Sequence, residues 1–188
     1  MQTNRSLNTI FQCAADRRVT FGTLLEIGPG TLWPGLHYLP AHPDLELIGA
    51  GYAPAERTAA RQLARKMKLL ARVDYREGRS DRLPVDDRSV DAVISYGTLH
   101  QWPRPLAMLD EIARVLKLGG RYFIGNVRRD ASWLSTFWSG LGNPNLRGVY
   151  AARAQAQDQA EFQRLLEMSR LAAATWVSVG PDLWAVSK

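Results

Sequence analysis

Short apolar runs alternate with longer amphipathic stretches along most of the chain. The runs that we predict to be strands are residues 23–27, 45–50, 72–76, 90–96 and 121–127. Between them, residues 54–70 and 105–116 place apolar side chains at the three- and four-residue spacing of a helix face. Alternation of strand and helix predicts a parallel sheet with helices on both faces, which is an α/β fold.

Both ends of the chain add elements to this pattern. We expect a helix over about residues 4–15 and an irregular short helix over residues 32–38. Gly119-Gly120 is expected to end the 105–116 helix, because glycine is common just past helix C-termini. In the last third, the predicted elements are a helix or loop over 131–139, a helix over 154–171, and strands over 173–179 and 183–187. The two strands flank Gly180-Pro181-Asp182 and predict a terminal β-hairpin.

The composition limits the class of protein. The 188 residues fit a single domain, and 46% apolar with 22% charged residues is the usual balance of a globular protein. No apolar run has the roughly 18 residues of a membrane-spanning helix, and the first residues lack the apolar segment of a signal peptide. The single cysteine, Cys13, excludes an internal disulfide framework. We therefore expect no membrane partner and a cytoplasmic location.

The positive charge does not by itself indicate a nucleic-acid partner. The formal net charge is +6, from 24 Lys and Arg against 18 Asp and Glu. The basic residues are mostly arginines scattered along the chain, and no run of five exists. A phosphate backbone is bound by a focused patch of charge rather than by scattered charge. A small-molecule substrate or ligand is the partner that we expect, and a homo-oligomer stays open.

A glycine-rich turn follows the first predicted strand. The strand ends in Glu26-Ile27-Gly28-Pro29-Gly30, and glycines at that place let the backbone approach a ligand at the carboxyl edge of a parallel sheet. The segment Leu99-His100-Gln101-Trp102 follows the fourth strand and belongs to the same edge. The sequence therefore predicts a ligand site at the carboxyl ends of the first and fourth strands.

Three segments together make the chain resemble the class I S-adenosylmethionine-dependent methyltransferases of the small UbiE-like type. They are LLEIGPG (24–30), RLPVDDRSVDAVISYGTLHQW (82–102) and EIARVLKLGGRYFIGNVRRD (111–130). The resemblance implies a Rossmann-like, seven-stranded, mostly parallel sheet of order 3-2-1-4-5-7-6. It also implies one methyltransferase-like domain over 1–188, with a helical cover (1–20), a nucleotide-binding-type core (21–130), and a helical lid with the hairpin (131–188).

The resemblance also implies which residues surround the cofactor, S-adenosylmethionine. Carried over position by position, the cofactor-binding residues are Glu26, Gly28, Gly30, Leu32, Gly51, Tyr52, Arg79, Ser80, Ser95 and Tyr96.

Three of these positions depart from the family pattern. Leu32 stands where a third glycine is usual, and Gly51 stands where an Asp or Glu accepts hydrogen bonds from the ribose hydroxyls. Arg79 stands where an Asp accepts from the adenine amino group, although Asp81 lies two residues further on. Loss of two acceptors predicts weak binding of S-adenosylmethionine. Arg79 either binds an anionic group or points to solvent and pairs with Asp81.

The substrate side of the implied site carries His100, Trp102, Arg128 and Trp133. His100 has the pKa range of a general base, or it orients the loop through a hydrogen bond to the backbone. The tryptophans either line the substrate or pack in the core. Arg128 faces an anionic group or is a solvated residue. The few histidines and the lone cysteine are too far apart in sequence for a structural zinc site, so no metal is expected.

Three functions are consistent with these residues. The first is methyl transfer from S-adenosylmethionine to a small molecule. The second is a methyltransferase fold converted to another, anionic ligand, such as a folate or another one-carbon carrier. The third is a non-catalytic interaction partner. A fold does not select among them, since function depends on the site.

Overall fold

A seven-stranded sheet forms the centre of the computed structural model, which describes residues 5–28, 33–51, 53–78, 82–127, 159–171, 174–179 and 182–187. The strand order is β3-β2-β1-β4-β5-β7-β6, which confirms the predicted fold. Strands β1 to β5 run parallel, whereas β7 is antiparallel to both β5 and β6. The strands are β1 (Phe21–Ile27), β2 (Asp44–Ala50), β3 (Val73–Tyr75), β4 (Val90–Tyr96), β5 (Leu116–Val127), β6 (Ala174–Val179) and β7 (Asp182–Ser187).

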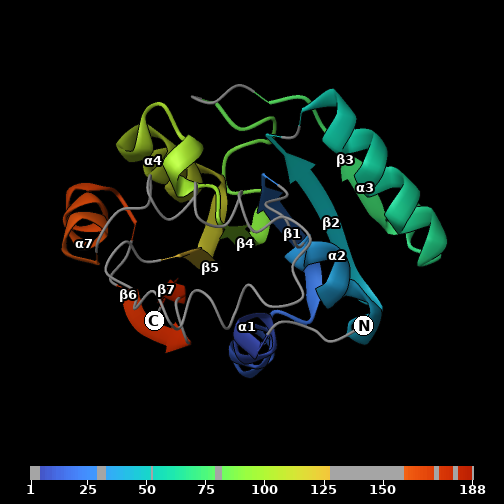
Figure 1. Ribbon diagram of the computed structural model, residues 1–188, viewed down its shortest axis with the longest axis horizontal. Coiled ribbons are helices and arrows are strands. Elements are labelled where there is room, and N and C mark those ends of the chain that lie inside the picture. Colours follow the sequence, from blue (N-terminus) through green and yellow to red (C-terminus); the bar gives the residue numbers. More distant parts are fainter. Residues whose placement is uncertain are drawn as a thin grey trace.

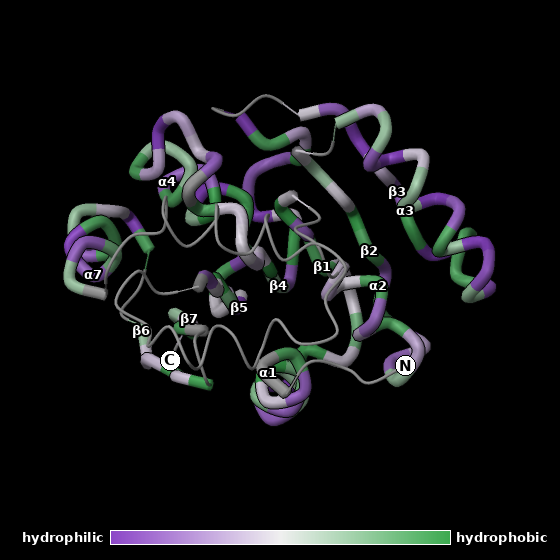
Figure 2. The backbone as a smooth tube through the Cα atoms, viewed as in Figure 1, coloured by the Kyte–Doolittle hydropathy of each residue, from purple (hydrophilic) through white to green (hydrophobic). Residues whose placement is uncertain are grey.

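Helices cover both faces of the sheet (Figure 1). They are α1 (Arg5–Asp16), α2 (Pro34–Tyr38), α3 (Pro54–Lys66), α4 (Pro105–Val115) and α7 (Gln159–Met168), with short 3-10 helices η1 (Leu39–Ala41), η2 (Leu70–Arg72) and η3 (Leu99–Gln101). The core on one face includes side chains of α4 and α7, and the core on the other includes side chains of α1, α2 and α3. Figure 2 shows hydrophilic residues on the side of α1 that faces away from the sheet.

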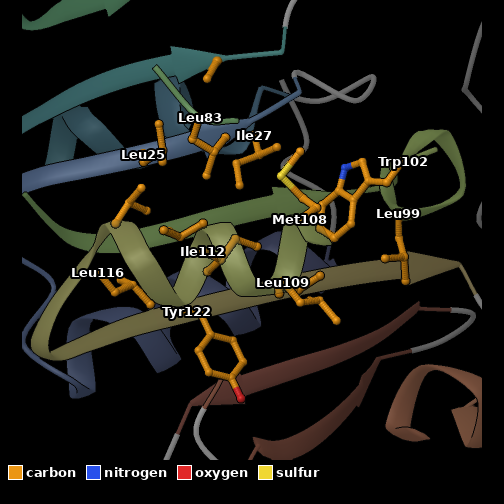
Figure 3. Close-up of a cluster of buried hydrophobic side chains, with 14 of the residues drawn as sticks. Leu25, Ile27, Leu83, Leu99, Trp102, Met108, Leu109, Ile112, Leu116 and Tyr122 are labelled. Atoms are coloured by element: carbon orange, nitrogen blue, oxygen red, sulfur yellow. The ribbon is translucent and has the colours of Figure 1, made fainter. Parts of the chain in front are cut away.

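The central strands β1 and β4 are mostly apolar because both of their faces are buried. In β4, Val93 packs under α4, while Ala92 and Ile94 pack in the core on the other face. Alternate side chains of a strand point to opposite faces, so a strand covered on both sides has no polar stripe. Figure 3 shows the first core, in which Leu109 and Ile112 of α4 lie over the sheet.

The expectation that Gly119-Gly120 ends the helix over 105–116 is wrong. Helix α4 ends at Val115, and β5 begins at once with Leu116, which pairs with Val90 of β4. The next pair is Ala92 with Arg121, so residues 117–120 form an irregularity within the strand. Gly119 has φ +77° there. The glycines therefore lie in a bulge at the start of β5. The helix ends at Val115 because the buried Leu116 pairs with the sheet.

Helix α3 is shorter than the predicted range 54–70. It ends at Lys66, because Lys68 adopts the left-handed conformation with φ +59° and the chain then turns into η2. In the described residues, no helix has the length and apolar character needed to cross a membrane. The predicted helix or loop over 131–139 lies outside the described residues.

Replacing Gly125 with alanine tests how closely β5 and β7 pack. A Cβ atom on Gly125 would lie 2.5 Å from Cε2 and Cε3 of the fully buried Trp184. Because the indole is enclosed, we expect Gly125→Ala to lower the free energy of unfolding by about 3 kcal/mol. Gly119→Ala is the matched control, since its Cβ would meet nothing within 4 Å. Its positive φ alone should cost about 1 kcal/mol. Equal losses in urea denaturation would contradict this packing.

Candidate functional site

Three glycines from three neighbouring strand ends meet at the carboxyl edge of the sheet. Gly28 follows β1, Gly51 follows β2, and Gly78 lies three residues beyond β3. A Cβ atom on Gly51 would lie 3.6 Å from the backbone nitrogen of Gly28, and a Cβ on Gly78 would lie 3.6 Å from that of Gly51. The glycines add no side chain of their own at this edge, although the Cβ position of Gly28 faces Thr98 and that of Gly78 faces Pro84.

Gly28 makes the turn out of β1. It has φ +65°, and its N–H donates to the carbonyl oxygen of Ala50 at 2.7 Å, which extends the ladder between β1 and β2. A Cβ atom on Gly28 would lie 2.8 Å from the Cγ2 methyl group of Thr98. Both the backbone angle and the contact exclude a side chain, so the chain leaves the sheet sharply at this point.

The carboxylate of Glu26 is fully buried below this turn. Its Oε1 accepts a hydrogen bond from the backbone N–H of Gly35 at 3.1 Å, near the N-terminus of α2. Burial, and then the negative charge of Glu26, raise the pKa of Tyr75 above its ordinary value. Glu26 thus links the end of β1 to the first turn of α2 through a buried hydrogen bond.

Two hydroxyl groups tie the end of β4 to the end of β1. Ser95 Oγ donates to the carbonyl oxygen of Ile27 at 2.9 Å and lies 2.6 Å from Thr98 Oγ1. Both residues are buried. Tyr96 is buried on the opposite face and stacks on Trp184, with ring centroids 5.1 Å apart. Of the predicted cofactor-binding residues, Ser95 and Tyr96 therefore have buried side chains that contact other residues of the protein.

The segment that follows β4 also lies at the carboxyl edge of the sheet. Gly97 has φ +68°, and a Cβ atom there would meet nothing within 4 Å. The main chain of His100 lies in η3, a short distance along the chain. Trp102 is buried in the core beside Met108, as Figure 3 shows, which is the packing alternative considered from the sequence. The structure brings Gly28, Gly51 and Ser95 to one edge of the sheet.

Several predicted site residues cannot be placed. Gly30, Leu32, Tyr52, Arg79, Ser80, Arg128 and Trp133 lie outside the described residues, and so does the side chain of His100. Within the part of the chain that the structure describes, no three His, Cys, Asp or Glu side chains gather as a metal site would require.

Asn126, near the end of β5, is not among the site residues predicted from the sequence. The residue is 5% exposed, and within the described residues neither Nδ2 nor Oδ1 has a hydrogen-bond partner. The signal available in the sequence was a lone amide in an apolar strand, RYFIGNV, close to the carboxyl edge.

A hollow of about 200 Å³ lies at the opposite edge of the sheet. Arg17, Phe21, Lys117 and Arg121 are among the residues that line it. Its carboxylate, Asp91, already binds Lys117 at 2.8 Å and the backbone N–H of Thr23 at 2.8 Å. Because open α/β sheets bind ligands at their carboxyl edge, the glycine-lined edge is the better candidate site.

Comparisons with known proteins relate the chain to a known family. A family profile described as "Methyltransferase domain" matches residues 25–124. The arsenite methyltransferase of Halobacterium salinarum is 33% identical over 112 residues, which are 58% of this chain and 28% of that enzyme. The chain thus matches only about a quarter of the length of this relative.

Two solved structures illustrate the similarity of fold. A SAM dependent methyltransferase from Aquifex aeolicus superposes with a TM-score of 0.73 at 15% identity, over 99% of both chains. The O-methyltransferase NcsB1 from neocarzinostatin biosynthesis, in complex with S-adenosyl-L-homocysteine, superposes with a TM-score of 0.67 at 17% identity, over 96% of this chain and 56% of that one.

The contact between Gly28 and Thr98 can be tested by a double-mutant cycle. Gly28→Ala should lower the free energy of unfolding by about 3 kcal/mol, from backbone strain and from overlap with the Thr98 methyl group. Thr98→Ser removes that methyl group and keeps the hydroxyl. The double variant should therefore recover about 1 kcal/mol relative to the sum of the single losses. Additive losses would place the strain in the backbone angle alone.

Proposed function

The chain belongs to the methyltransferase-domain family, and on this basis we propose that it transfers a methyl group from S-adenosylmethionine to a small molecule. The observation that carries the proposal is the glycine-lined carboxyl edge, whose turns lie within the matched residues 25–124. The named relative is itself a methyltransferase. None of the comparisons supports the two alternatives, conversion to another ligand or a non-catalytic role.

The geometry at Gly28 and Gly51 suits a ligand that lies along the backbone. Neither residue has a side chain of its own, and a Cβ atom on Gly51 would lie 3.6 Å from the backbone nitrogen of Gly28. When bound, S-adenosylmethionine supplies an electrophilic methyl group on its sulfonium. Glu26 and Ser95, which are buried beneath this surface, hold the strand ends that form it. We propose that Glu26 and Ser95 do not touch the cofactor and instead fix the backbone segments against which it lies.

The end of β2 fits the cofactor less well. Gly51 offers no side-chain acceptor for the ribose hydroxyls, and it has φ +76° in an exposed turn. A charged hydrogen bond that is absent weakens binding by roughly 1.5–3 kcal/mol. We therefore propose that this chain binds S-adenosylmethionine more weakly than a relative that has a carboxylate at this position.

Calorimetry with S-adenosylmethionine and S-adenosylhomocysteine tests both proposals. We expect saturable binding of both compounds by the natural chain, and about tenfold tighter binding by Gly51→Asp, a gain of about 1.4 kcal/mol. Gly51→Asn is the matched control, because asparagine tolerates the same left-handed backbone but carries no charge. The gain should be smaller in that variant.

The two proposals fail in different ways. Absence of binding at about 1 mM ligand, in the natural chain and in Gly51→Asp alike, would rule out the methyltransferase proposal. Binding that is equally tight in the natural chain and in Gly51→Asp would refute only the weak-site proposal, since other groups would then hold the nucleoside.

We also propose His100 as the general base that accepts a proton from the substrate nucleophile. Its main chain lies in η3, on the segment that leaves the carboxyl end of β4. With a substrate that the protein accepts, His100→Ala should lower kcat by about a hundredfold. The loss of activity on protonation of the base, at the acid end of the pH profile of kcat, should disappear with it. An unchanged kcat together with a lower melting temperature would assign His100 a structural role.

A further inference from the structure

Asn126 is a buried carboxamide without a protein partner. The residue is 95% buried, and within the described part of the chain neither Oδ1 nor Nδ2 makes a hydrogen bond. By contrast, the buried side chains of Glu26, Ser95 and Ser187 each have a hydrogen-bond partner at 2.9–3.1 Å. Asn126 therefore differs from the buried polar groups that serve the fold.

An unpartnered amide in this position opposes folding. Burying an amide removes its hydrogen bonds to water, and without replacements the loss is not recovered. An apolar side chain of similar size would avoid this loss. Buried groups that break the rule in this way are characteristic of functional sites, where a ligand completes the hydrogen bonds.

The position of Asn126 on the sheet agrees with a ligand contact. The preceding residue, Gly125, pairs with Tyr96 at the end of β4, and its carbonyl oxygen accepts from the N–H of Gly97 at 2.8 Å. Asn126 thus lies one residue beyond the end of β4, at the carboxyl edge. Gly97 beside it borders open space. Two separate features, the open space and the amide, occur at neighbouring positions on adjacent strands.

The neighbours of Asn126 that the structure describes on its own strand and on β7 are apolar. Strand alternation places it on the same face as Tyr122 and Ile124, which belong to the core under α4 and α7. On the other side it pairs with Leu183 of β7, which is 3% exposed. A net charge placed here would lose its hydration and find no counter-ion on these neighbours.

We propose that Asn126 binds a neutral polar group of the methyl-accepting substrate, a hydroxyl or a carboxamide, through its side-chain amide. Oδ1 accepts a hydrogen bond from that group, and Nδ2 donates one to it, which is the pairing that a carboxamide allows. The substrate class that follows is a neutral hydroxyl- or amide-bearing molecule with an apolar body. This inference rests on the proposed methyltransferase function.

Substitutions with opposite effects on stability separate a ligand contact from a structural role. Asn126→Leu removes an unpartnered amide, so the melting temperature should rise or stay unchanged. Ser187→Ala is the matched control on the adjacent strand, because Ser187 Oγ is buried and accepts from the N–H of Tyr122 at 3.1 Å. Its melting temperature should fall by about 3 °C. A lower melting temperature for Asn126→Leu as well would overturn the proposal.

Four probes of one shape test the ligand chemistry in the full chain, by calorimetry in the presence of S-adenosylhomocysteine. They are 2-naphthol and 2-naphthamide as neutral polar probes, 2-naphthoate as an anion, and naphthalene as a body without a polar group. We expect the two neutral polar probes to bind at least about tenfold more tightly than 2-naphthoate and naphthalene. The preference should vanish in Asn126→Leu and persist in Ser187→Ala.

The outcomes are distinct. A preference for 2-naphthoate, no measurable binding of either neutral polar probe, or a preference that survives Asn126→Leu would each overturn the proposal. Asn126→Asp provides a second variant of the same shape, and loss of the two amide donors should weaken 2-naphthamide binding. If the probes bind as expected while S-adenosylhomocysteine does not bind at all, the methyltransferase function fails and the neutral polar site stands.

Discussion

The turn after β1 depends on a close contact between Gly28, which has no Cβ atom, and the methyl group of Thr98. That contact lets the end of β4 lie against the end of β1, where Ser95 donates to the carbonyl oxygen of Ile27. On its other side, Gly28 donates to Ala50 and so holds the end of β2. Three strand ends are thereby fixed by one position without a side chain, and the candidate site is the surface that they form together.

The fold could be predicted from the sequence because its signals are redundant. Each central strand is an apolar run, the helices between them are amphipathic, and the resemblance to a known family supplies the strand order. Boundaries were less predictable, because they depend on tertiary contacts. Leu116 continued the helical spacing of residues 105–116, yet it pairs with Val90 and begins β5. A local pattern carries no information about a partner on another strand.

Within the candidate site, the sequence predicted the positions of the glycines at the strand ends better than the surroundings of the side chains. Gly28 and Gly51 lie at the carboxyl edge, where a glycine next to an apolar strand indicates a turn. For side chains, the residue type did not reveal the environment. Ser95 and Asn126 are both buried polar residues near the ends of strands, but one has its partners in the protein and the other does not. That difference arises from atoms far away in sequence, so it becomes visible only in three dimensions.

Gly51 illustrates how a chemical requirement and a conformational one can meet at a single residue. Its φ of +76° favours glycine, and a Cβ atom there would lie 3.6 Å from the backbone nitrogen of Gly28, whose N–H donates to Ala50. A carboxylate there would add an acceptor for a nucleoside but would strain the backbone, because an L side chain rarely adopts this positive φ. A side chain that binds the ribose is therefore opposed by the geometry of the turn that brings β1 and β2 together. The turn explains how glycine can persist at this position in a methyltransferase domain, since it preserves the shape of the edge at the expense of one hydrogen bond.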